Sequence, residues 1–346
     1  MQNKKSYITL LNVLSAFAVV YLHVNNSCFG NFSYWSYWPT AVVIRAFFYY
    51  AVPIFLMLSG ANLIDYRDRY TTKEYAVRRA KKILPPYLFF SLIALLIYIR
   101  FENPYFQISL SSILNGLVNS DFMGAYWFFM PLFLFYLAAP LFSAVERGKR
   151  VRICTYLVVA GFVVNIFIPF AISVFSLPIY NVPEFGPVAG YLIYPLLGYV
   201  IDNYDFKKAW RIAIYILGVA ALILDIFGTI YTSWMTGVMS DLYYGYLNVP
   251  CFIYSSAVFL LFKQIGPRLM EMKLIVRLND FMARYSFGIY LMHMYFVKSF
   301  ETLAPYVGIN SYSLSYRLIM PIVIINICIF LIWLLRKIPG VKHILP

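Results

Sequence analysis

The sequence has 346 residues, of which 62% are hydrophobic and only 12% are charged. A chain this apolar has more hydrophobic surface than one water-soluble core could bury, which argues against an ordinary soluble protein. Its formal net charge is +14. No soluble segment carries a basic stripe interleaved with aromatic residues, so the charge does not indicate nucleic-acid binding. The composition therefore predicts an integral membrane protein.

Long apolar runs recur along the chain, and each is close to the roughly 20 residues that an α-helix needs to cross a bilayer. Uninterrupted runs exclude a transmembrane β-barrel, whose strands alternate in polarity. The sequence predicts an all-α polytopic membrane protein with about ten transmembrane helices. These are expected near residues 6–27, 41–64, 83–99, 126–145, 153–174, 187–201, 210–231, 247–262, 285–305 and 314–335.

The distribution of basic residues predicts the orientation. If the N-terminus lies inside, the inner connectors contain 24 of the 28 Lys and Arg residues. Cytoplasmic loops are enriched in Lys and Arg, so both termini are expected on the cytoplasmic side of the cytoplasmic (inner) cell membrane. The longest connectors have only about 25 residues, too few for a soluble domain. We expect residues 1–346 to form a single transmembrane domain with no soluble extracytoplasmic domain.

The connector after the second predicted span contains the best helix signal. Thr71 and Glu74 have the spacing of a capping box, which predicts that a helix begins there. Pro85 and Pro86 lack amide hydrogens, so we expect this helix to end before them. It would carry four cations at the inner surface: Arg78, Arg79, Lys81 and Lys82. These cations could bind phosphate groups or anionic lipid, or they could reflect the topology alone.

Ionisable side chains within the predicted spans are functional candidates, because burying charge in hydrocarbon is costly. His23 and Arg45 are expected at similar depth near the outer ends of the first two spans, whereas Asp225 and His293 lie in later spans. Asn12 and His23 should lie within roughly 20° of one helix face and about 16 Å apart. Histidine suits proton removal near neutral pH, so His23 is a candidate general base. Alternatively, Asn12 and His23 only hydrogen-bond to neighbouring helices.

Two other kinds of site have little support. Ser59 and Gly60 lack the flanking glycine pattern of a hydrolase nucleophile elbow, and such pairs more often permit close helix packing. The histidines and cysteines have no spacing typical of metal ligands, so no metal site is expected. They occur at His23, His293, His343, Cys28, Cys154, Cys251 and Cys328.

Six segments resemble, in the same order, motifs of one protein family. They are Asn12–His23, Val52–Gly60, Arg78–Lys82 with the following Ile83–Tyr87, Trp127–Phe129, Tyr194–Tyr199 and Ser286–His293. Together they resemble the acyltransferase 3 family of membrane acyltransferases, over nearly the whole chain. The first segment is similar to the family's Arg-(ten residues)-His motif, whose histidine is implicated in acyl transfer.

Two positions depart from the family pattern. Asn12 stands where the family usually has Arg, so the motif lacks its cation. Arg45, expected near the depth of His23, is our candidate for the compensating charge. Lys82 stands where the third basic residue of the next motif is usually Arg, which keeps the charge but loses bidentate recognition.

The resemblance implies transfer of an acyl group, most often acetyl, from cytoplasmic acyl-CoA to a hydroxyl of a surface polysaccharide or lipid-linked glycan. It implies acetyl-CoA or another acyl-CoA as the donor substrate, without a permanently bound cofactor. His23 would be general base or acyl relay, with Asn12 and Arg45 as further catalytic candidates. The CoA phosphates would bind to the basic helix at Arg78, Arg79 and Lys82.

Other classes of membrane protein stay open. A proton-coupled transporter or flippase of a glycan precursor is the main alternative, since buried His, Arg and Asp in a helix bundle are also typical of carriers. A glycan polymerase or ligase is a third possibility. Only an acyltransferase would consume the thioester of acyl-CoA when acceptor is present.

Overall fold

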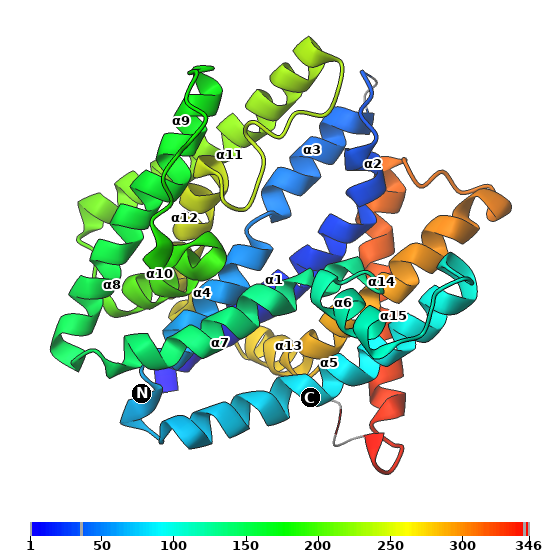
Figure 1. The fold of residues 1–346 in the computed structure, drawn as a ribbon, viewed down its shortest axis with the longest axis horizontal. Coiled ribbons are helices and arrows are strands. Elements are labelled where there is room, and N and C mark those ends of the chain that lie inside the picture. The colour runs from blue at the N-terminus through cyan, green and yellow to red at the C-terminus, as the bar shows by residue number, and fades with distance from the viewer. Residues whose placement is uncertain (1, 35–36, 342–343, 345–346) are drawn as a thin grey trace.

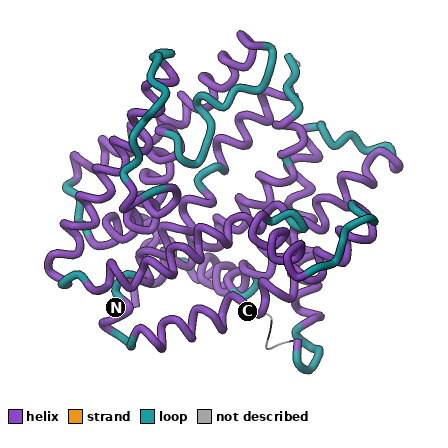
Figure 2. Tube along the Cα trace, viewed as in Figure 1, coloured by secondary structure: helices purple, strands orange, loops and turns teal. Residues whose placement is uncertain are grey.

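The computed structural model describes residues 2–34, 37–341 and 344, and for residues 2–6 it describes the backbone alone. All regular structure in these ranges is helical (Figures 1 and 2). The predicted all-α architecture is confirmed. The α-helices are α1 (Gln2–Val24), α2 (Asn26–Gly30), α3 (Tyr37–Phe48), α4 (Ala51–Leu63), α5 (Thr72–Ile97), α6 (Leu110–Asn119), α7 (Phe129–Ala144), α8 (Arg147–Gly161), α9 (Ile168–Val174), α10 (Ile193–Asn203), α11 (Lys208–Thr236), α12 (Val249–Leu269), α13 (Lys273–Ala283), α14 (Ser286–Leu303) and α15 (Leu314–Leu335).

Eight helical segments of the described chain are long and apolar enough to cross a membrane, which makes this an integral membrane protein. They correspond to eight of the ten expected spans. The expected span 187–201 contains α10, which has only 11 residues but is almost entirely buried. The expected span 285–305 corresponds to α14, which carries Lys298 and Glu301 and is less apolar. Both helices belong to the bundle, although neither has the length and hydropathy of the other eight.

The second expected span, 41–64, is not one continuous helix. Its chain forms α3 and α4, with Tyr49 and Tyr50 between them and Pro53 in the first turn of α4. Proline lacks the amide hydrogen that would bond to the previous turn. At membrane depth, irregular backbone is tolerated where it is buried in protein or lines a cavity. Tyr49 lines a cavity that is described below, so the break between α3 and α4 lies at the wall of the candidate site.

Helices α4 and α10 pack with their backbones in close approach. A Cβ added at Gly60 would lie 2.7 Å from the Cα of Pro195 and closer still to its carbonyl group. Gly198 faces the backbone of Met57 in the same way. The Ser59 hydroxyl donates to the Phe55 carbonyl oxygen at 2.9 Å, within its own helix. Gly60 therefore permits close helix packing, as predicted.

Helix α5 begins as predicted and ends elsewhere. The amide of Glu74 donates to the Thr71 hydroxyl at 3.3 Å, and the Glu74 carboxylate accepts from the Thr71 amide at 2.8 Å, which completes the capping box. The predicted end before Pro85 and Pro86 is wrong, because α5 continues to Ile97. Proline in a membrane helix is tolerated when its surroundings satisfy the freed carbonyl groups four residues earlier. Those carbonyls belong to Lys81 and Lys82, which both line a large cavity.

The start of α1 and the end of α15 lie on the same lower side of the molecule in Figure 1, where α5 also begins. Helix α9, the end of α11 and the turn between α2 and α3 lie on the opposite side. This arrangement is compatible with the orientation expected from the basic connectors. The assignment of the lower side to the cytoplasm stays a prediction.

Candidate active site

Two cavities approach each other inside the bundle, along opposite halves of α1. The first, which we call the histidine cavity, has a volume of about 430 Å³ and reaches Val19, Leu22 and His23 of that helix. The second, the basic cavity, has a volume of about 990 Å³ and reaches Ile8, Thr9 and Asn12. Phe128 and Tyr290 line both. These two aromatic residues therefore mark the boundary between the cavities.

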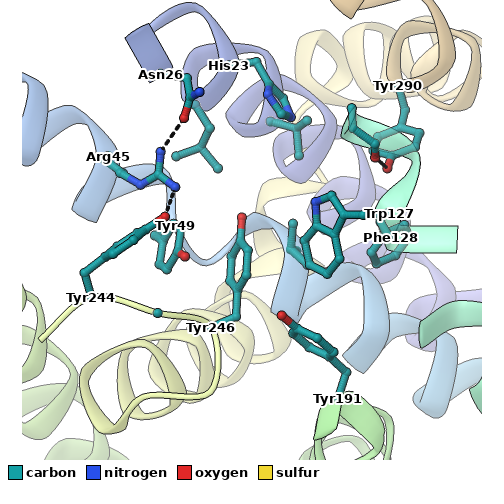
Figure 3. A pocket seen from close by; sticks show the side chains of 15 residues that line it. His23, Asn26, Arg45, Tyr49, Trp127, Phe128, Tyr191, Tyr244, Tyr246 and Tyr290 are labelled. Atoms are coloured by element: carbon teal, nitrogen blue, oxygen red, sulfur yellow. Dashed lines mark hydrogen bonds between the residues drawn. The ribbon is translucent and has the colours of Figure 1, made fainter. Parts of the chain in front are cut away.

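The histidine cavity brings together two of the predicted site residues. His23 comes from the last turn of α1 and Arg45 from the last turn of α3, just before the break in the second span. Their placement on one cavity agrees with the expectation that they lie at similar depth. The opposite wall is aromatic, as Figure 3 shows, and consists of Tyr49, Trp127, Phe128, Tyr191, Tyr244, Tyr246 and Tyr290. None of the described residues that line this cavity is acidic.

Among the described residues, the hydrogen-bond and ring partners of the Arg45 guanidinium are neutral groups. Its Nη1 donates to Asn26 Oδ1 at 3.0 Å and its Nη2 donates to the Tyr244 hydroxyl, as the dashed lines in Figure 3 mark. Its Cζ lies 4.3 Å from the ring centroid of Phe29, 4.5 Å from that of Tyr244 and 5.1 Å from that of Tyr49, within range of cation–π attraction. Arg45 is therefore fixed in place while its charge stays available to an anion in the cavity.

His23 is paired with a second histidine. The ring centroids of His23 and His293 lie 5.1 Å apart. His293 is fully buried on α14, and its Nδ1 lies 3.0 Å from the Ile289 carbonyl oxygen. A carbonyl only accepts hydrogen bonds, so this contact assigns the proton of neutral His293 to Nδ1 and leaves Nε2 as an acceptor. Nε2 has no hydrogen-bond partner among the described residues. His293 thus offers an unused acceptor beside the candidate base.

The basic cavity is lined by six cationic residues and, within the described chain, by no acidic one. The cations come from α5, from the connector before it and from the connectors around α14 and α15: Arg69, Arg79, Lys81, Lys82, Arg284 and Arg336. Of the residues expected to bind CoA, Arg79 and Lys82 line the cavity. Arg78 does not line it, although its guanidinium lies over the ring of Tyr70, a lining residue, 5.1 Å from the centroid. Lys81, one of the four cations expected on the basic helix, also lines the cavity, whereas Arg69, Arg284 and Arg336 were not selected from the sequence.

Asn12 lies in the basic cavity, not beside His23. Its Nδ2 donates to the Ser286 hydroxyl at 3.0 Å, and that hydroxyl donates to the Ala283 carbonyl oxygen at 3.2 Å. Asn12 thus hydrogen-bonds to the first residue of a neighbouring helix, α14, as the alternative interpretation of this position expected. The two motif positions on one helix face open into different cavities.

Several site residues were not selected from the sequence. The pairing of His23 with His293 joins positions far apart in the chain, and the only sequence signal was the family-like segment that ends at His293. Tyrosines are frequent in this chain, 32 in all, so nothing in the sequence singled out the five on the cavity wall. Among the described residues, no group of three or more His, Cys, Asp or Glu could hold a metal ion. His343 lies outside the described residues.

The described chain is an all-helical membrane bundle with two adjacent cavities, one lined by His23 and Arg45 and the other by six cations. The model of the acyltransferase 3 family, an acyltransferase domain, matches residues 5–336. The chain belongs to this family, and its activity is acyl transfer from an acyl donor to an acceptor. Comparison with curated proteins and with solved structures gave no significant match.

Proposed function

We propose that this protein transfers an acetyl group from acetyl-CoA, bound in the basic cavity, to a hydroxyl of a surface polysaccharide or lipid-linked glycan, bound in the histidine cavity. The observation that carries the proposal is the pair of cavities that share Phe128 and Tyr290. One cavity is rich in cations and the other contains a histidine beside an arginine. A donor and an acceptor could thus reach one reaction centre from opposite sides.

The basic cavity suits the phosphate groups of CoA. Arginine presents a planar fork of donors to phosphate oxygens and lysine a compact charge, and both gain strength where no carboxylate competes. Arg79, Lys81 and Lys82 come from α5, whereas the residues shared with the histidine cavity, Phe128 and Tyr290, are aromatic. The phosphates would bind near Arg79 and Lys82, and the pantetheine arm would extend toward the aromatic end.

The histidine cavity suits a sugar acceptor. Aromatic side chains offer apolar faces to the C–H groups of a sugar ring and, in tyrosine, a hydroxyl that can hydrogen-bond. Tyr191, Tyr244 and Tyr246 enter from two different connectors and face His23 across the cavity (Figure 3). An acceptor bound against them would present a hydroxyl to the imidazole.

The chemistry follows from His23 and Arg45. The imidazole of His23 takes the proton of the acceptor hydroxyl as the oxygen attacks the thioester carbonyl carbon. Arg45 stabilises the negative charge that develops on the carbonyl oxygen. The tetrahedral intermediate then collapses, the C–S bond breaks, and the proton held by His23 passes to the CoA thiolate. The products are the acyl ester and free CoA.

We further propose that His293 is a positioning residue for His23. Its Nε2 can accept a hydrogen bond from one ring nitrogen of His23, which leaves the other nitrogen of His23 as a base toward the cavity. We also propose that the protein forms a single domain in the cytoplasmic membrane with both termini inside. The basic cavity then opens to the cytoplasm, where acyl-CoA is found.

The test of the chemistry is acyl transfer by purified His23→Ala, measured beside its acetyl-CoA affinity. We expect the rate to fall by about a hundredfold to ten-thousandfold with acetyl-CoA binding kept, because only the base is lost. Near-normal turnover would remove His23 from the mechanism. A wild-type protein that leaves acetyl-CoA intact in membranes containing acceptor glycan would instead favour a transporter or flippase.

The test of the donor site uses two neighbouring arginines as a matched pair. Arg79→Gln removes a cation that lines the basic cavity, so it should raise the Michaelis constant for acetyl-CoA, and less so at high salt. Arg78→Gln removes the same charge one residue earlier, outside the cavity, and should change that constant little. An unchanged Michaelis constant in both variants would return the basic helix to a purely topological role. An equal rise in both would contradict the distinction between Arg78 and Arg79.

A further inference from the structure

The two cavities meet at three aromatic rings. Phe128 and Tyr290 line both cavities, and Phe55 lines the basic cavity beside them. The ring centroids of Phe128 and Tyr290 lie 5.8 Å apart, those of Phe55 and Phe128 5.8 Å, and those of Phe55 and Tyr290 6.2 Å. Each ring thus contacts the other two. We call these three residues the aromatic partition.

The partition is held rigidly on the side of Tyr290. Its hydroxyl donates to the Ala125 carbonyl oxygen at 2.5 Å, and its ring packs edge-on against Phe129 at 5.7 Å between centroids. The same ring lies 5.9 Å from that of His293, the partner of His23. Phe128 is only 7% exposed. A group between these rings therefore meets walls that give way little and lies next to the histidine pair.

We propose that the aromatic partition limits the length of the acyl chain that the enzyme transfers. The inference rests on the proposed function, in which the thioester reaches His23 from the basic cavity. When the carbonyl carbon is close enough to be attacked, the acyl chain must lie among the three rings or share the histidine cavity with the acceptor. A short chain fits in either place. A longer chain must displace one of these three mutually packed rings or reduce the space left for the acceptor.

Sites of this kind discriminate by size, because a closely packed pocket rejects each added methylene by about tenfold or more. The wild-type enzyme should therefore prefer acetyl over butyryl by at least tenfold in kcat/KM. Phe128 is the residue to alter, because it bounds both cavities and makes no side-chain hydrogen bond. Shortening it should open space on the acyl side while leaving Tyr290 and its hydrogen bond in place.

The experiment measures kcat/KM for acetyl-, propionyl-, butyryl- and hexanoyl-CoA, with transfer of radiolabelled acyl groups to glycan in native membranes as the readout. Phe128→Ala and the milder Phe128→Leu should each raise the ratio of butyryl to acetyl transfer at least tenfold. Phe133→Leu is the matched control, since Phe133 is a half-buried phenylalanine near Phe129 that lines neither cavity. Its ratio should equal that of the wild type.

Three results would count against these proposals in different ways. Phe128 variants that are active but keep the wild-type ratio overturn the role of the partition and leave the proposed function intact. A wild-type enzyme with equal kcat/KM for all four acyl-CoAs also overturns the role of the partition and leaves the proposed function intact. A wild-type protein that transfers none of the four overturns the proposed function, and the role of the partition with it.

Discussion

The close approach of α4 and α10 predicts that Gly60→Ala destabilises the protein strongly. The new Cβ would lie 2.7 Å from the Cα of Pro195, whereas ordinary van der Waals contact begins at 3.4 Å. The obstructing atoms belong to the backbone, so no change of rotamer relieves the clash and the helices must move apart by about 0.7 Å or more. Overpacking of this kind costs about 3 kcal/mol. The better helix propensity of alanine offsets about 1 kcal/mol, which leaves about 2 kcal/mol of lost stability.

The assay measures the thermal stability of purified protein in detergent. The fraction of protein that stays monodisperse is determined after heating to each temperature, and the temperature at which half remains is the midpoint. A loss of about 2 kcal/mol should lower the midpoint by about 3 °C, because the unfolding entropy that divides it grows with chain length. Gly148→Ala is the matched control, because Gly148 is also helical and a Cβ there meets nothing within 4 Å. Its midpoint should stay the same or rise. A Gly60→Ala midpoint equal to that of Gly148→Ala would refute the close packing of the two helices.

Three further predictions concern an ion pair, the charge of Arg45 and the orientation of the chain in the membrane. Asp65→Asn should cost about 3–5 kcal/mol, seen as a lower thermal midpoint, because it leaves the guanidinium of Arg150, whose side chain is 4% exposed, without its ion pair. Arg45→Gln should lower acyl transfer at least tenfold, because the charge beside the reaction centre is lost. Adding Asn12→Arg should not restore the activity, since position 12 lies in the other cavity, and recovery in the double variant would contradict this placement. An introduced Cys at Glu74, in a cysteine-free variant, should resist an impermeant thiol reagent in intact cells, and labelling there would reverse the predicted orientation.

Local signals in the sequence predicted the parts of the fold that depend on neighbouring residues. The apolar runs identified the membrane helices, because crossing a bilayer demands length and hydropathy that any window of the sequence displays. The Thr71 and Glu74 capping box predicted the start of α5 for the same reason. The small size of Gly60 indicated close helix packing, although only the structure shows that α10 is the partner.

Features that depend on surroundings were missed. Pro85 and Pro86 do not end α5, because local propensity is overridden when neighbouring groups satisfy the freed carbonyls. Helix periodicity placed Asn12 and His23 on one face, which is geometrically sound, but it could not reveal that aromatic rings from α4, from α14 and from the turn just before α7 divide the space beside that face. His293 reaches His23 only through the packing of α14 on α1, and no spacing along the chain encodes that contact.

The aromatic partition also bears on the integrity of the membrane itself. Two cavities that met without a barrier would form an aqueous path, and each elementary charge moving through it across 100 mV would dissipate about 2.3 kcal/mol of the cell's stored energy. Narrow apolar constrictions stop such flow by excluding water. Phe128 and Tyr290 line both cavities, and the Tyr290 hydroxyl donates to the Ala125 carbonyl oxygen, so under the proposed orientation we expect the two rings to act as that kind of constriction. Cells that produce Phe128→Ala should therefore become more permeable to protons, whether or not an acyl donor is bound.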